Sequence, residues 1–115
     1  MDEDESLLAD GWVAAARLDQ IPDGAGLCVI VNNTPIALFQ WNGGVYAIDD
    51  RCMHMGMSLA SGVMENGVVE CPGHGWRFRI ADGAWVSCPK NRLRTFPTRV
   101  AGGVVYLKMN APAAP

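Results

Sequence analysis

The sequence predicts an all-β fold, a small sandwich or barrel. Turn signals recur at short intervals, from Pro22-Asp23-Gly24 through Asn42-Gly43-Gly44 to Ala101-Gly102-Gly103. The runs between these turns are short and rich in β-branched and aromatic residues. No segment keeps a helical apolar period over about ten residues, so a helical turn near Ser6–Ala9 or Asp19–Ile21 is the most helix that we expect.

The expected strands lie between these turns, in order along the chain. Asn32-Asn33 and Gly102-Gly103 predict tight hairpins, because both residue types tolerate positive φ. From the N-terminus, the expected strands are Trp12–Ala16, Leu27–Val31, Thr34–Gln40, Gly44–Asp49, Val68–Glu70, Arg77–Ile80, Ala84–Val86, Arg94–Val100 and Val104–Lys108. At 115 residues, we expect a single domain with one modest core over residues 1–115.

Hydropathy and charge indicate where the protein is located and which classes of partner it does not bind. No apolar run approaches the roughly 18–20 residues that span a bilayer. The start Met1-Asp2-Glu3-Asp4-Glu5 lacks the basic and apolar regions of a signal peptide. We therefore expect a cytoplasmic protein with no membrane partner. The bases gather after Cys71, but they alternate along expected strands like a solvated outer face, so we expect no nucleic acid partner.

Two short motifs carry the chemistry of this chain. Cys52-Met53-His54 and Cys71-Pro72-Gly73-His74 contain both of its histidines. Each motif offers one thiolate and one imidazole, so two adjoining loops would present two sulfurs and two ring nitrogens. Gly56 and Gly75 follow the histidines and allow a close approach of the backbone. The candidate metal ligands are therefore Cys52, His54, Cys71 and His74.

Two metal centres use such a donor set. Structural zinc sites usually pair Cys with Cys and His with His along the chain. Here each motif mixes the two types, which suits a two-iron cluster with the sulfurs on one iron and the nitrogens on the other. The mixed order favours the 2Fe-2S cluster, and a zinc-stabilised interaction module without a redox role stays an alternative.

The other two cysteines are predicted to have packing roles. Cys28 lies in the apolar run Leu27–Val31, where we expect a small buried hydrophobe. Cys88 precedes Pro89 in an expected loop, where we expect packing or partial exposure. We expect no disulfide, because cytosolic thiols stay reduced.

The C-x-H…C-x-x-H pattern resembles that of the Rieske-type 2Fe-2S ferredoxins and is complete at all four ligand positions. The resemblance implies a Rieske fold, in which a β base carries an inserted cluster-binding subdomain, here from about residue 50 to about residue 84. It also implies one 2Fe-2S cluster per chain, held by Cys52, His54, Cys71 and His74. Residues 1–10 and 110–115 are expected to be frayed tails.

Two departures from the respiratory members of this family indicate a low reduction potential. Where those proteins have two cysteines joined in a disulfide, this sequence has Met57 and Gly73. Where they have a Ser and a Tyr whose hydroxyls bond to sulfur, it has Trp76 and Phe78. Because hydrogen bonds to sulfur stabilise the reduced state, we expect a potential nearer about −150 mV than +300 mV.

The remaining aromatic and thioether side chains suggest how the site is covered. Trp76, two residues after His74, is a candidate shield between the cluster and water, whereas the other tryptophans are expected to pack in the core or against hairpins. Around His54, the methionines Met53, Met55 and Met57 are expected to form a soft apolar rim suited to short-lived contacts.

The function expected from the resemblance is electron transfer, without catalysis by this chain. Both histidines are used by the cluster, so none is left for a mononuclear iron site of two His and a carboxylate. The resemblance implies a one-electron carrier between an NAD(P)H-dependent flavin reductase and a terminal ring-hydroxylating oxygenase. The alternative is the small Rieske subunit of an NAD(P)H nitrite reductase, bound to the large subunit of that enzyme.

Overall fold

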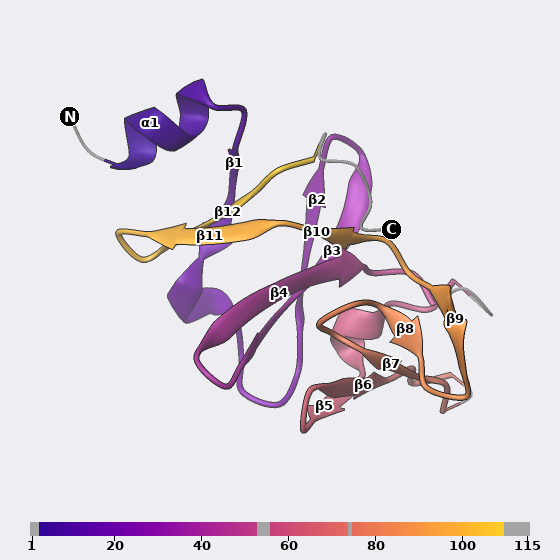
Figure 1. Ribbon diagram of the computed structural model, residues 1–115. Helices are drawn as coiled ribbons and strands as arrows, with labels where there is room; N and C mark the ends of the chain where they lie inside the picture. The colour runs from indigo at the N-terminus through magenta and orange to yellow at the C-terminus, as the bar shows by residue number, and fades with distance from the viewer. Residues whose placement is uncertain (1–2, 53–55, 74, 110–115) are drawn as a thin grey trace.

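The computed structural model describes residues 3–52, 56–73 and 75–109, which form three antiparallel sheets and a few short helices (Figure 1). The helices are α1 (Glu3–Ala9) and the 3-10 turns η1 (Leu18–Gln20) and η2 (Leu59–Ser61). The strands are β1 (Val13–Arg17), β2 (Leu27–Val31), β3 (Thr34–Trp41), β4 (Gly44–Asp49), β5 (Val63–Glu65), β6 (Val68–Glu70), β7 (Arg77–Arg79), β8 (Ala84–Trp85), β9 (Cys88–Arg92), β10 (Thr95–Phe96), β11 (Thr98–Ala101) and β12 (Val104–Leu107).

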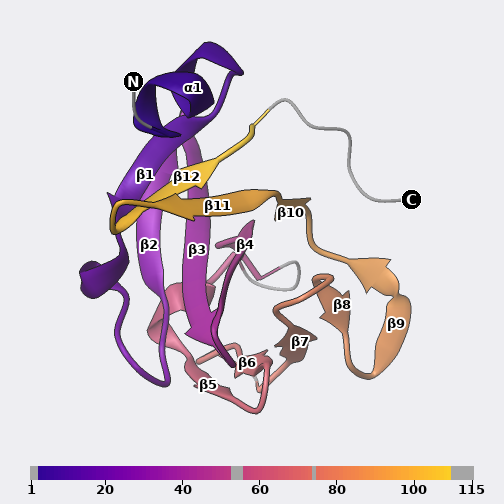
Figure 2. The same ribbon diagram turned by 60° about the vertical axis from the view of Figure 1, so that its left-hand side comes forward.

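The three sheets have the strand orders β1-β12-β11, β10-β4-β3-β2 and β5-β6-β7-β8-β9. Figures 1 and 2 show the third sheet on the far side of β3 and β4 from β12. The all-β prediction is confirmed. No helix within the described ranges is long and apolar enough to cross a membrane.

The second sheet is buried on both faces, which explains its sequence. β3 holds the uninterrupted buried run Ile36-Ala37-Leu38-Phe39. Alternate residues of a strand point to opposite faces, so Ile36 and Leu38 pack on one side and Ala37 and Phe39 on the other. On the first side lies the contact with β12, through Val105 and Leu107.

The opposite side of the second sheet carries the core that concerns the site. We call it the site core, and its members come from β3, β4 and the third sheet with its connections. Its buried residues are Ala37, Phe39, Ile48, Cys52, Leu59, Ala60, Met64, Val69, Cys71, Phe78, Ile80 and Leu93.

The hairpin turns form where the sequence predicts them. Asn32 and Asn33 have φ of 50° and 63° and join β2 to β3. Gly102 and Gly103 have φ of 58° and 78° and join β11 to β12. Positive φ at both central residues gives the turn twist that matches two paired strands.

Two strands, β5 and β9, were not predicted from the sequence, and one expected strand is divided in two. β5 is only three residues long, and β9 is an exposed edge strand whose Pro and polar residues are typical of a loop. Cys88 therefore lies in a strand, where it is half-buried. The expected strand Arg94–Val100 is divided into β10 and β11 at Pro97, which has no N–H to donate to a ladder.

Two further expectations are wrong. The first ten residues were expected to be frayed, but α1 forms, and its Leu7 is buried against Ala101 and Tyr106. Cys28 was expected to be buried, but it is exposed, because β2 is the edge strand of its sheet. Residues 110–115, also expected to be frayed, lie outside the described residues. The limits of 50 and 84 for the inserted subdomain stay a prediction; the third sheet runs on to Arg92.

Candidate functional site

Two loops of the same construction hold the cysteines of the two motifs. In the first cysteine loop (residues 52–57), the N–H of Gly56 donates to the carbonyl oxygen of Cys52 at 2.8 Å, and the N–H of Cys52 donates to that of Met57 at 2.9 Å. In the second cysteine loop (residues 71–76), the N–H of Gly75 donates to Cys71 at 3.1 Å, and the N–H of Cys71 donates to Trp76 at 2.7 Å. The same two main-chain bonds thus close both loops.

Each closure depends on a glycine four residues after the cysteine. Gly56 and Gly75 have φ of +70° and +74°, in the left-handed region that side chains other than that of Gly rarely adopt. Among the described residues, no atom lies within 4 Å of a Cβ built at either position. The backbone angle is therefore the observed reason for a glycine at both positions.

The sheets fix where both loops begin and end. The first loop leaves β4 through Asp50, which is 3% exposed. The carbonyl oxygen of Asp50 accepts from Leu59 N–H at 2.6 Å, and its Oδ1 accepts from Ala60 N–H at 2.9 Å. The second loop joins β6 to β7, where Glu70 and Arg77 pair across the strands. Both loops therefore project from paired backbone.

Cys52 and Cys71 lie together in the site core, 2% and 1% exposed. No disulfide joins any of the four cysteines, all of which belong to the described residues. The thiolates that metals bind are poorly solvated in apolar surroundings, so they need the compensating charge of a metal there. The structure thus places both predicted sulfur ligands in one core. His54 and His74 lie outside the described residues, as do Met53 and Met55.

The two cysteine loops touch each other at Met57 and Gly73. A Cβ built on Gly73 would meet three atoms of the Met57 side chain, of which Cγ is the nearest at 3.1 Å. Met57 is 40% exposed, as a rim residue should be. The contact therefore lies where an apolar side chain bridges the loops and also reaches solvent.

Trp85 contributes to the site, although its sequence context indicates only packing. Its ring stacks on that of Trp76, with centroids 3.9 Å apart and planes inclined by 7°. The register explains the contact, because Trp85 pairs with Phe78, and Trp76 lies two residues before Phe78 on the same face. The expected strands do not give this contact, because Trp76 precedes the expected strand Arg77–Ile80.

Cys28 differs from the two buried cysteines in its surroundings. It lies on the edge strand β2, outside the site core. Partial burial of its sulfur raises the pKa of the Cys28 thiol, and the negative charge of Asp50 and a hydrogen bond with Asp50 raise that pKa further. Within the described ranges, no group of three or more His, Cys, Asp or Glu residues surrounds a possible metal position.

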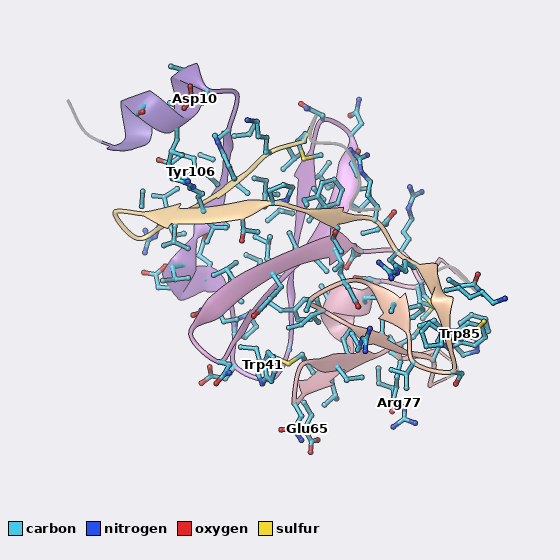
Figure 3. All side chains as sticks on the ribbon, viewed as in Figure 1. Asp10, Trp41, Glu65, Arg77, Trp85 and Tyr106 are labelled. Carbon is cyan, nitrogen blue, oxygen red and sulfur yellow. The ribbon has the colours of Figure 1, made fainter. Side chains whose placement is uncertain are left out.

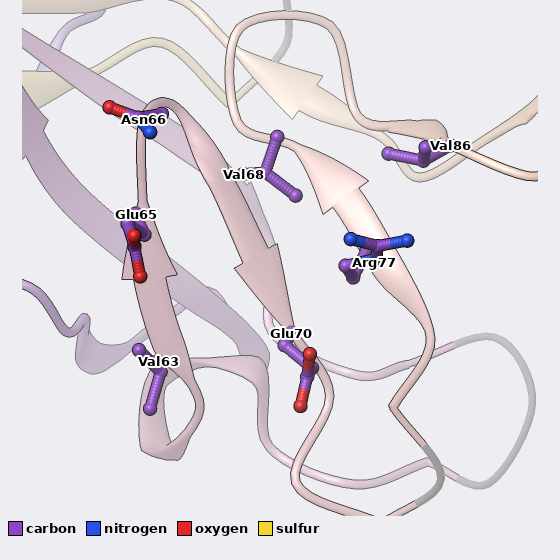
Figure 4. Close-up of a pocket in the computed structure, with 7 residues that line it drawn as sticks. All are labelled: Val63, Glu65, Asn66, Val68, Glu70, Arg77 and Val86. Atoms are coloured by element: carbon purple, nitrogen blue, oxygen red, sulfur yellow. The ribbon is translucent and has the colours of Figure 1, made fainter.

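A surface groove of about 500 Å³ lies on the outer face of the third sheet, away from the site core (Figure 4). Three valines, two glutamates, an asparagine and an arginine line it. None of the described residues in its lining is a cysteine, so neither Cys52 nor Cys71 faces this groove. The residues are Val63, Glu65, Asn66, Val68, Glu70, Arg77 and Val86.

The matching family model and the relatives of similar sequence indicate the same protein family. Residues 11–97 match the family described as the Rieske [2Fe-2S] domain. The chain is 35% identical over 103 residues to the ferredoxin component of the naphthalene 1,2-dioxygenase/salicylate 5-hydroxylase systems of Ralstonia sp, covering 89% of this chain and 99% of that protein. It is 30% identical over 104 residues to the ferredoxin component of the naphthalene 1,2-dioxygenase system of Pseudomonas aeruginosa, covering 90% and 100%.

Solved structures agree with the sequence relatives. The ferredoxin of Sphingomonas yanoikuyae B1 superposes with a TM-score of 0.77 at 26% identity, over 85% of this chain and 98% of that one. A chain from the complex of reduced oxygenase and oxidized ferredoxin in carbazole 1,9a-dioxygenase gives the same TM-score and identity, over 90% and 98%.

Proposed function

Because this chain belongs to the Rieske [2Fe-2S] domain family, we propose that Cys52 and Cys71 bind one iron of its cluster and His54 and His74 bind the other. The two described ligands fit that role, since both are buried at the first position of loops closed by the same bonds. The chain carries one 2Fe-2S cluster, which accepts and returns a single electron when bound.

The donor set controls the charge of the site. Two thiolates cancel the charge of the oxidised irons and sulfides, and the imidazoles are neutral, so the site is neutral when oxidised and singly negative when reduced. A centre with four thiolates would start negative and become more so. Adding an electron to the neutral site costs less Coulomb energy, and the difference is large in a low-dielectric interior.

The chain is a ferredoxin component, an electron carrier and not itself a catalytic enzyme. Similarity over nearly the whole length of two dioxygenase ferredoxins carries this conclusion. Its electron acceptor is a terminal ring-hydroxylating oxygenase, as in the oxygenase–ferredoxin complex of carbazole 1,9a-dioxygenase. We propose that its donor is an NAD(P)H-dependent flavin reductase and that it works in the cytoplasm. No observation favours the nitrite reductase subunit or the zinc module.

The ligand assignment is tested with cysteine variants matched by residue type. Cys52→Ser and Cys71→Ser remove proposed ligands, and Cys28→Ser and Cys88→Ser change cysteines outside the site. We expect the first pair to lose the visible absorbance and the rhombic EPR signal of the reduced protein, and the second pair to keep both. Zinc in place of iron, or loss confined to Cys28→Ser, would contradict the assignment.

The carrier role is tested by reconstitution. The chain is added to the reductase and oxygenase components of a naphthalene 1,2-dioxygenase system, and product formed from NAD(P)H is measured. We expect product only when this chain is present. A cluster that dithionite reduces but that supports no turnover in this mixture, while supporting a nitrite reductase large subunit, would replace the oxygenase by the alternative partner.

A further inference from the structure

We propose that Trp85 is a positioning residue, which holds Trp76 over the second cysteine loop and thereby limits the access of water to the cluster. The proposal rests on the proposed function, because it concerns the cluster that this loop helps to bind. The two cysteine loops are closed by the same main-chain bonds but differ in the side chain of the closing residue.

The two loops differ in the residue that closes them. That residue is Met57 in the first loop and Trp76 in the second, and the carbonyl oxygen of each accepts from the N–H of its cysteine. Met57 is 40% exposed and has a flexible side chain. Trp76 is only partly exposed and packs against the site core, which contains both cysteines. A rigid aromatic ring therefore packs against the core where the second loop closes, and a flexible thioether borders the first loop.

Trp85 determines where the Trp76 ring lies. The two rings are 3.9 Å apart and nearly parallel, an arrangement that contributes about 0.5–1.5 kcal/mol beyond area burial. A main-chain hydrogen bond fixes the backbone of Trp76, and the stack with Trp85 supports its ring from a neighbouring strand. Trp85 packs against the same core.

The strand that carries Trp85 is itself held before and after this residue. The N–H of Val86 donates to the carbonyl oxygen of Arg77 at 2.8 Å. The N–H of Ala84 donates to Oδ1 of Asp82 at 3.0 Å. Arg77 directly follows Trp76, so β8 is anchored to the strand that leaves the second loop. Trp85 is thus a fixed platform for the ring of Trp76.

The reduction potential reports on this cover. The reduced site carries one more negative charge than the oxidised site, and water stabilises that charge more than an apolar surrounding does. Solvent exposure is one of the factors that set the potential of an iron–sulfur cluster. Removing the Trp85 ring should release Trp76, admit water and shift the midpoint potential to more positive values. It should also expose the cluster to chelators.

The experiment compares Trp85→Ala with Trp41→Ala in the cluster-loaded protein. Trp41 is a matched control: it is also partly buried against the site core, but its ring partner is Tyr46 at 6.3 Å. Figure 3 shows Trp41 and Trp85 in separate regions of the molecule. The measurements are the midpoint potential by protein-film voltammetry, the bleaching rate with EDTA, and the far-UV circular dichroism couplet of stacked indoles.

We expect Trp85→Ala to lose the couplet, shift the potential positively and bleach severalfold faster, and Trp41→Ala to match the unmodified protein in potential and couplet. An unchanged potential in folded Trp85→Ala, or an equal shift in Trp41→Ala, would overturn the proposal. If Trp85→Ala does not fold, Trp85→Leu decides by the same criteria. The failure of the proposed function is a separate result, because it would leave the unmodified protein without a 2Fe-2S spectrum.

Discussion

Gly62 is the position where one methyl group should disturb the site most. It follows η2 and has φ of −83°, an ordinary value for any residue. A Cβ there would overlap the carbonyl oxygen of Glu70 and lie 3.0 Å from its carbonyl carbon. Non-bonded carbon atoms pack at about 3.5–4.0 Å. The oxygen is the nearer of the two atoms, so the two backbones would have to separate by about 1 Å or more. Glu70 directly precedes Cys71, and the displacement therefore reaches the second cysteine loop.

The expected cost of Gly62→Ala is about 3 kcal/mol, at the upper end for overpacking because the opposing atoms are backbone. In a domain of this size, that lowers the melting temperature by about 10 °C. The assay follows unfolding of the loaded protein by circular dichroism at 222 nm and by cluster absorbance, and we expect both transitions to move down together.

Gly44→Ala is the control for this change. Gly44 has no left-handed φ, and a Cβ there would meet only the end of the Tyr46 side chain, at 3.2 Å. We expect a change in melting temperature of less than about 4 °C, since this side chain can move. Equal melting temperatures for Gly62→Ala and the unmodified protein would refute the idea that Gly62 spaces the two backbones.

Three further results are expected. Without hydroxyls at Trp76 and Phe78, voltammetry at pH 7 should give a midpoint near about −150 mV, and a strongly positive value would contradict this. The double variant Met57→Cys/Gly73→Cys should form a disulfide. A Cβ at position 73 lies 3.1 Å from Cγ of Met57, and this distance matches the roughly 3 Å from Cβ to the partner sulfur in a disulfide. Thiol titration should therefore show no more reactive thiols than in the parent chain. For Asp82, burial favours a higher pKa, but hydrogen bonds from the Arg79 guanidinium and the N–H of Ala84 outweigh it and lower the pKa. The stabilisation relative to Asp82→Asn should therefore be present at pH 7, amount to less than about 1 kcal/mol, and disappear as the pH falls below about 4; a difference that grows in acid would be the wrong sign.

Strands β2, β3 and β4 and the turns between them were predictable because local signals and tertiary packing agree there. β2 and β4 have the predicted bounds, and β3 extends by one residue. Cys28 shows where such reasoning fails, since an apolar strand at a sheet edge looks the same in sequence as one at the centre. β9 fails for the opposite reason, because Pro89 and its polar neighbours indicate a loop, and only pairing with β8 makes the segment a strand.

The sequence predicts four donor residues for the site, and the structure describes two of them, Cys52 and Cys71. The motif spacing identifies Cys52 and Cys71, which the structure buries in one core. The closing hydrogen bonds of the loops and the stack of Trp85 on Trp76 depend on register and on main-chain geometry. Neither the hydrogen bonds nor the stack can be predicted from the identity of single residues, so the structure was needed to find them.

The bonds that close the two cysteine loops join main-chain atoms only. Apart from the glycines with positive φ, these bonds place no demand on which side chains the intervening positions carry, but the proposed function requires His54 and His74 as ligands. Substitutions at the other intervening positions can therefore change the face that meets a redox partner while the loops keep their shape. Partner choice and cofactor retention are in this sense separable traits, free to evolve at different rates.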